Sequence, residues 1–291
     1  EQHKFGVHQR LSLRNKGGEP HQLMMSATPI PRTLAMSYYT DLDISVIDEL
    51  PPGRTPVITK LVHDNRRDEV LERIHQACLS GQQAYWICPL IDGSDTLELQ
   101  TVLETHQRLV QALPDLRVDL IHGKLDAANK TRSMTAFKMG ETHLLIATTV
   151  IEVGVDVPNA SIMVIEHAER MGLAQLHQLR GRIGRGTTQS LCILLFQEPL
   201  SELARARLKI IYENTDGFEI ARQDLNLRGP GELLGARQHG IPMLRFADIT
   251  QDTALLQCAR TIADEMLYNF QQEARAHLQR WVSNKQDYLY V

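Results

Sequence analysis

Apolar and polar residues alternate in two rhythms over residues 56–214. Short apolar runs predict β-strands, and the run at 84–91 is continuous enough for a strand buried on both faces. Between these runs apolar residues recur at spacings of three and four, which predicts amphipathic helices. The alternation predicts an α/β fold with a doubly wound, mostly parallel sheet. Strands are predicted at 56–62, 84–91, 118–122, 143–148, 160–166 and 190–196, and helices at 66–79, 99–113, 126–139, 173–182 and 200–213.

The two flanks of this region follow other patterns. The first residues hold too few elements to close a domain and are interpreted as the end of a preceding one; the chain also begins without Met. Two prolines and a glycine at 51–53 favour a linker. After the last strand a short helix is expected over 219–227 and a long one over 253–282, with Phe270 and Trp281 as core residues. The predicted segments are 1–48, 49–55, 56–214, 215–250 and 251–291, the last two mainly helical.

The composition is ordinary for a globular protein, with 43% hydrophobic and 23% charged residues. No apolar run approaches the ~18 residues of a membrane span. The first residues lack the apolar segment of a secretion signal, so we expect a cytoplasmic protein. The four cysteines lack metal-ligand spacing, so most are interpreted as core residues of a reduced protein and no metal site is expected among them. Trp86, within an apolar strand, is also expected in the core.

The net charge of −4 excludes a basic coat for nucleic acid, but basic residues are concentrated locally. Arg170, Arg180, Arg182 and Arg185 lie in a stretch without an acidic residue. Because local clusters decide where phosphates bind, this stretch is a candidate phosphate contact. His122 ends a predicted strand and either approaches nucleic acid or caps a loop.

The most specific string is Gln-Leu-Arg-Gly-Arg-Ile-Gly-Arg at 178–185. Its glycines allow close backbone approach, and Arg182 and Arg185 project planar, permanently charged groups. Such groups suit a triphosphate on which negative charge builds during transfer, where one arginine contributes roughly 10³–10⁵ in rate. A solvated basic helix end is the alternative for this string taken alone.

Two further strings accompany it. The stretch 148–158 follows an apolar strand, and ligands of open α/β sheets bind beyond the carboxyl ends of strands. Ser26-Ala27-Thr28 precedes a proline and, taken alone, is typical of a structural turn. Their order and spacing together with 178–185 argue against coincidence.

These strings resemble the motifs of superfamily 2 nucleic-acid helicases, and 178–185 matches Gln-x-x-Gly-Arg-x-Gly-Arg at every defined position. The resemblance implies that 56–214 is the second RecA-like domain of such a motor, and that Thr148 touches the nucleic-acid backbone. Glu1-Gln2-His3 resembles the Asp-Glu-Gln-His box of the first domain without its Asp. The resemblance implies catalytic roles for Glu1, Arg182 and Arg185, and roles in ATP binding or its coupling for His3, Ser26, Thr28, Gly154, Asp156 and Gln178.

The resemblance implies ATP and Mg²⁺ as cofactors. The sequence contains no Gly-x-x-x-x-Gly-Lys-[Ser/Thr] string, which in this superfamily cradles the β- and γ-phosphates. Because positioning and electrostatics carry phosphoryl transfer, we expect these 291 residues alone not to hydrolyse ATP, and ATP–Mg²⁺ to be bound mainly by an upstream domain.

The stretch 216–240 resembles the translocation motif shared by the RecG family of branched-DNA helicases and the transcription-repair coupling factors. Its Gly-Pro-Gly-Glu at 229–232 favours the RecG family. The resemblance implies that Arg207 and Arg228 brace a helical hairpin and that Gln238 lies on a moving loop beside duplex DNA. A helix–turn–helix cap of structural role is the alternative reading of the same residues.

The family implies an ATP-dependent DNA helicase that remodels stalled forks and Holliday junctions in repair and recombination. Its partners would be branched double-stranded DNA and the upstream first motor and wedge domains of the same protein, and we expect a bacterial, nucleoid-associated monomer. The alternatives are a coupling-factor type of duplex translocase and a non-catalytic nucleic-acid-binding module. Paired arginines argue against the last, because a scaffold needs no guanidinium pair aimed at a cleft.

Overall fold

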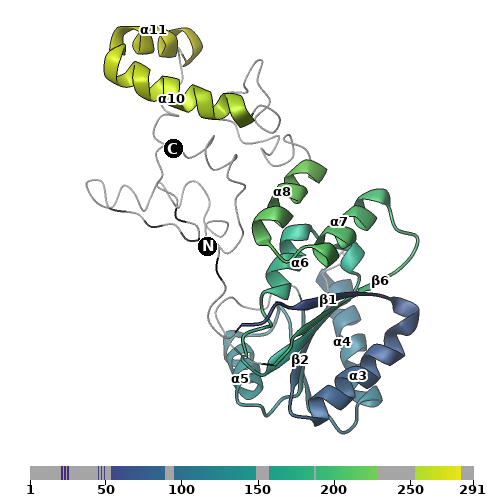
Figure 1. The fold of residues 1–291 in the computed structure, drawn as a ribbon. Coiled ribbons are helices and arrows are strands. Elements are labelled where there is room, and N and C mark those ends of the chain that lie inside the picture. The colour runs from purple at the N-terminus through teal and green to yellow at the C-terminus, as the bar shows by residue number, and fades with distance from the viewer. Residues whose placement is uncertain are drawn as a thin grey trace. The chain divides into compact units, whose positions relative to one another are not determined.

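The structure, a computed structural model, describes residues 54–88, 95–148, 157–186, 188–228 and 253–282, with isolated positions before residue 50. The chain divides into two compact units, Val46–Asp224, and Glu1–Ser45 with Leu225–Val291. The first unit holds the sheet, and the second holds the last two helices (Figure 1). Within the described ranges no helix is long and apolar enough to cross a membrane.

The sheet of the first unit has six described strands in the order β1-β6-β5-β2-β4-β3, and every pair is parallel. The doubly wound α/β prediction is therefore confirmed. Each predicted strand is present, with ends shifted by a few residues. The strands are β1 (Ile58–His63), β2 (Gln83–Cys88), β3 (Val118–Ile121), β4 (Leu144–Thr148), β5 (Ala160–Ile165) and β6 (Leu191–Phe196).

Helices cover both faces of this sheet, with α3 and α4 together on one side (Figure 1). Two of them begin where the sequence supplies an N-cap: Asp126 accepts from the Asn129 N–H, and Ser201 from the Ala204 N–H. The helices of this unit are α3 (Arg67–Leu79), α4 (Asp95–Ala112), α5 (Ala127–Lys138), α6 (Leu173–Arg180), α7 (Glu202–Glu213) and α8 (Gly217–Arg228), with short turns η2 (Asp64–Arg66) and η3 (Ala168–Arg170).

Strand β2 lies at the centre of the core, and all six of its residues are buried, as its continuous apolar run predicts. Trp86 belongs to the cluster under α3 and α4, which confirms its expected core role. On the opposite face Tyr85 packs against Phe137 of α5, with ring centroids 4.8 Å apart. Three of the four cysteines, Cys78, Cys88 and Cys192, are buried, as expected for small core residues.

The long helix predicted over 253–282 is wrong in one respect. The structure has two helices, α10 (Thr253–Asn269) and α11 (Gln271–Val282), which contact each other. The break falls at Phe270, whose side chain is 48% exposed and not in a core. Nearly all described residues of both helices are exposed, including Leu255, Ile262 and Leu267, so these apolar residues form no core with each other. No glycine or proline lies near 270, so the sequence carries no stop signal.

Candidate functional site

The two ends of the parallel strands define two edges of the sheet, and candidate residues lie at both. Thr148 ends β4 and pairs in register with Cys88, so it lies at the carboxyl edge. Its side chain is 4% exposed. The turn with Arg182 and Arg185 follows α6 and leads into β6, so it lies at the amino edge. The general rule that ligands bind at the carboxyl ends of the strands therefore does not apply to the arginine turn.

This arginine turn, defined as residues 181–186, is packed against two other chain segments. Gly184 has φ +77°, and a Cβ there would lie 2.8 Å from the Val57 Cγ2. A Cβ on Gly186 would lie 2.5 Å from the carbonyl oxygen of Pro158. Only glycine allows both approaches. The turn is thereby held between the residue before β1 and the last residues of the 148–158 string, which brings two of the predicted motifs together.

Helix α6 leads directly into the arginine turn. It begins at Leu173, where the Gly172 N–H donates to the Gln175 Oε1 at 3.1 Å, and it ends at Arg180. Gln178 is exposed on its last turn, and Arg182 and Arg185 are half-buried in the arginine turn. The structure thus places these three predicted residues on one short stretch at the amino edge.

Arg180 is a correction to the sequence analysis, which grouped it with the arginines available to phosphate. It is 4% exposed and faces the protein interior. Its Nη1 donates to the carbonyl oxygens of Ile211 and Asn214, each at 2.8 Å, and to the Thr59 Oγ1 at 3.3 Å. Its Nη2 lies 3.4 Å from the Thr215 carbonyl oxygen. Charge clustering alone does not show this difference: Arg180 ends α6 and faces inward, whereas Arg182 is half-buried in the turn that follows.

His177 completes this buried group. Its Nδ1 lies 3.2 Å from the Arg180 Nη2, so Nδ1 accepts and the ring is neutral. Burial, followed by the nearby Arg180 charge, lowers the pKa of His177 to about 4. Burial likewise lowers the pKa of Arg180, which stays protonated at neutral pH.

At the carboxyl edge, Arg207 of α7 donates from Nη2 to the backbone oxygen of Glu169 at 3.0 Å. Arg207 Nε and Glu169 Oε2 are buried and have no hydrogen-bond partner among the described residues. Arg207 therefore connects α7 to η3, while its Nε and the Glu169 Oε2 can still form hydrogen bonds. Arg228 is the last residue of α8, and its side chain lies outside the described set.

A second group at this edge was missed by sequence reasoning. Glu166, 4% exposed, follows β5 and bonds to Arg67, while the Trp86 Nε1–H donates to its Oε1 at 2.8 Å. The Arg67 guanidinium also lies 5.1 Å from the centre of the Trp86 ring. A glutamate at the end of an apolar run was the available signal, but its partner lies far away in sequence.

His122 lies after β3, where its Nδ1 is buried without a hydrogen-bond partner among described residues. Burial and the charges of Lys130 and Lys124 lower its pKa. Lys130 Nζ donates to the Gly123 carbonyl oxygen at 2.9 Å. A neutral histidine beside two lysines fits both alternatives left open by the sequence.

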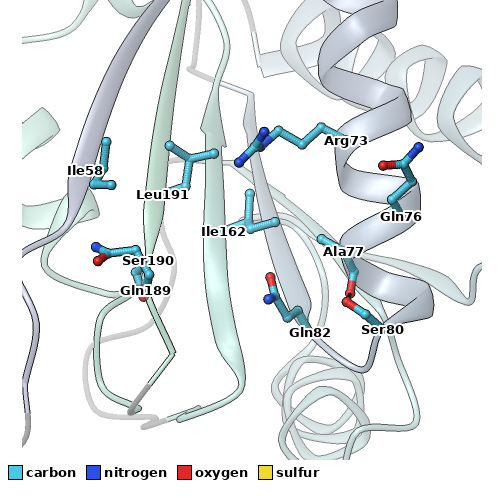
Figure 2. Close-up of a pocket in the computed structure, with 10 residues that line it drawn as sticks. All are labelled: Ile58, Arg73, Gln76, Ala77, Ser80, Gln82, Ile162, Gln189, Ser190 and Leu191. Atoms are coloured by element: carbon cyan, nitrogen blue, oxygen red, sulfur yellow. Dashed lines mark hydrogen bonds between the residues drawn. The ribbon is translucent and has the colours of Figure 1, made fainter.

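A cavity of about 400 Å³ also lies at the amino edge, under α3 (Figure 2). Its floor is formed by Ile58, Ile162 and Leu191, and its rim includes Arg73 and Gln189. In the described part of the chain no group of His, Cys, Asp or Glu side chains is arranged to hold a metal ion. Seven predicted site residues lie outside the described residues: Glu1, His3, Ser26, Thr28, Gly154, Asp156 and Gln238.

Comparison with known proteins identifies the class. Residues 66–187 match the family model "Helicase conserved C-terminal domain". With the all-parallel sheet and the arginine turn, this defines the second RecA-like domain of a superfamily 2 helicase. Residues 214–282 match the model "ATP-dependent DNA helicase RecG, domain 3, C-terminal".

The relatives agree with that second match. Over 99% of its length the chain is 54% identical to the ATP-dependent DNA helicase RecG of Escherichia coli (strain K12) and 55% identical to that of Acidithiobacillus ferridurans. The solved structure of RecG bound to a three-way DNA junction is 45% identical, with a TM-score of 0.67, covering 88% of this chain and 32% of that chain. The chain belongs to the RecG family, and it spans 42% of the length of these two curated relatives.

Proposed function

We propose that this chain is the C-terminal motor half of an ATP-dependent DNA helicase that remodels branched DNA, such as stalled forks and Holliday junctions. The observation that carries the proposal is the arginine turn, whose glycines press it against Val57 and Pro158. Arg182 and Arg185 are half-buried in this turn, and a turn fixed at that closeness holds their guanidinium groups at a defined place, as phosphoryl transfer requires. The similarity to RecG bound to a three-way junction supports DNA as the partner.

In this proposal the two sheet edges serve two ligands. Arg182 and Arg185 at the amino edge meet the γ-phosphate of ATP held with Mg²⁺ by the first motor domain, where Glu1 orients the attacking water. Gln178, Gly154 and Asp156 complete the nucleotide-facing side. These groups supply charge and orientation, which are the main contributions of a protein to phosphoryl transfer.

The remaining predicted residues act on DNA. Thr148 at the carboxyl edge contacts the strand backbone, and Ser26 and Thr28 relay nucleotide state. Residues 216–240, braced by Arg207 and Arg228 and carrying Gln238, move duplex DNA. An amide or hydroxyl suits a contact with phosphate oxygens that is independent of sequence. We further propose a nucleoid-associated cytoplasmic monomer, as the bacterial RecG relatives suggest.

The test uses the full-length protein that carries these residues, with ATP turnover measured in the presence of a synthetic three-way junction. Arg185→Ala should lower junction-stimulated turnover by roughly 10³-fold or more, since the lost guanidinium stabilises transition-state charge. Arg66→Ala removes an exposed arginine that pairs with Glu69 outside the predicted motifs, so it is the control and should leave turnover unchanged. Unchanged turnover in Arg185→Ala would overturn the proposal. The 291 residues alone should show no turnover, since they lack a phosphate-binding loop.

A further inference from the structure

Arg180 occupies a junction between two segments with different proposed tasks. It is the last residue of α6, and the arginine turn begins at the next residue. Its guanidinium reaches the end of α7, where it bonds the carbonyl oxygens of Ile211, Asn214 and Thr215. Helix α8, the start of the proposed DNA-moving segment, begins at Gly217. One buried side chain therefore spans the two segments.

The bonded carbonyls explain why this link is firm. The last carbonyls of a helix have no partner within the helix and carry the negative end of its dipole. Arg180 satisfies those of α7 with a delocalised positive charge, away from water. Releasing the contact would leave a buried charge and the buried Ile211 carbonyl oxygen unpaired, so the two segments stay joined when either moves.

The contact continues directly into the first turn of α8. The Asp216 side chain accepts from the Phe218 N–H at 2.9 Å, and its backbone oxygen accepts from the Ile220 N–H at 3.1 Å. Ile220 itself is 2% exposed and anchors that turn in the core. A shift of Thr215 must therefore move the start of α8.

We propose that Arg180 is a positioning residue that couples the arginine turn to α8, so that closure of the nucleotide cleft is transmitted to the DNA-moving segment. This proposal rests on the proposed functions of the arginine turn and of residues 216–240. Arg180 is not a catalytic residue, because its guanidinium is turned inward and touches neither ligand. Its substitution should separate ATP consumption from DNA movement.

The first experiment measures that separation in the full-length protein, as ATP hydrolysed per junction unwound. Arg180→Met, similar in length but apolar, should raise this ratio about tenfold, the size expected for a coupling residue, while the KM for ATP stays unchanged. Arg180→Lys keeps the charge but cannot bridge several carbonyls, so it should give an intermediate ratio. A purely structural role would lower both activities together and leave the ratio unchanged.

Arg117 supplies the matched control. It also clamps carbonyls at the amino edge, bonding the backbone oxygens of Glu141 and Gly140, but at the β3–β4 end of the sheet. Arg117→Met should therefore reduce stability and leave the ratio unchanged. A wild-type ratio in both Arg180→Met and Arg180→Lys would overturn the coupling role. Absence of ATP turnover in the wild type would instead overturn the proposed function.

Hydrogen exchange of the wild type gives a second readout. A non-hydrolysable ATP analogue should change exchange in the arginine turn and also at the amides of Asn214, Phe218 and Ile220. In Arg180→Lys the change in the turn should persist and that at 214–220 should be lost. Without nucleotide, Arg180→Lys should already speed exchange at 214–220, a result independent of turnover. No response at 214–220 in the wild type when the turn responds, or a full response in the variant, overturns the inference.

Discussion

The arginine turn at the amino edge of the sheet and the Glu166 group at the carboxyl edge are held in different ways. In the arginine turn, Gly184 leaves no room beside the Val57 side chain, and Gly186 leaves none beside the Pro158 carbonyl oxygen. At the carboxyl edge, long polar side chains make the connections, with Glu166 joining Arg67 and Trp86. The first arrangement depends on the absence of a methyl group, and the second on the presence of charge.

This difference matches the demands we assign to each edge. A misplacement of about 1 Å costs roughly 10²-fold in a positioned reaction, so a nucleotide-facing turn gains from rigid backbone packing. Contacts with nucleic-acid backbone tolerate, and use, side chains that can exchange partners. The comparison also predicts the effect of substitutions. At the carboxyl edge they should destabilise by leaving a charge unpaired, and in the arginine turn by displacing the backbone.

The largest stability effect is expected at the carboxyl edge. Glu166→Ala removes the carboxylate from a buried pair and leaves Arg67 and the Trp86 Nε1–H without it, which should cost about 3 kcal/mol of unfolding free energy. Urea unfolding of the 291-residue chain, followed by far-ultraviolet circular dichroism, measures it.

Glu166→Gln is the control for this variant. The amide keeps an oxygen acceptor for the Trp86 N–H but loses the charge that Arg67 needs, so its cost should fall between wild type and Glu166→Ala. Equal stability of Glu166→Ala and wild type would break the comparison, since the carboxyl edge would then not depend on charge.

The next effect belongs to the amino edge. Gly186→Ala places a Cβ 2.5 Å from the Pro158 carbonyl oxygen, which is too close. The backbone must therefore shift, which should cost about 2 kcal/mol of unfolding free energy. The same displacement should lower ATP turnover of the full-length protein. Gly123→Ala is the matched control, because a Cβ there meets nothing within 4 Å. If both variants behave alike, close backbone approach does not hold the arginine turn.

Most of the fold could be predicted from the sequence, because the spacing of apolar residues is a local property. The continuous apolar run of β2 predicts a strand buried on both faces, and the structure has one. Spacing of three and four predicts a helix at 66–79, and the structure has α3 there with Val70, Ile74 and Cys78 buried. The break at Phe270 was missed because no glycine, proline or other stop signal lies near it.

The site was predictable only where its residues are neighbours in sequence. The string 178–185 located the arginine turn, whereas the pairing of Gly186 with Pro158 requires the folded chain. The inward direction of Arg180 depends on carbonyls of a helix that follows β6, and no local pattern reports them. Glu166 and Arg67 likewise meet only after three strands and two helices have assembled.

The smallest effect on stability is expected at the half-buried His177, beside Arg180 at the amino edge. The pKa of His177 is about 4 in the folded chain, below the ~6.5 of an exposed histidine. Between these values the unfolded chain binds more protons, so the free energy of unfolding falls as pH falls through this window. With a discount for partial exposure, His177 should account for about 1 kcal/mol of loss between pH 7 and pH 5. In His177→Gln the amide oxygen takes the place of the ring Nδ1 as acceptor, and the side chain does not titrate. Urea unfolding should therefore show a shallower pH dependence of stability in that variant. Identical slopes would mean that neither burial nor the Arg180 guanidinium opposes protonation of His177, so that His177 would not contribute to the pH dependence of stability.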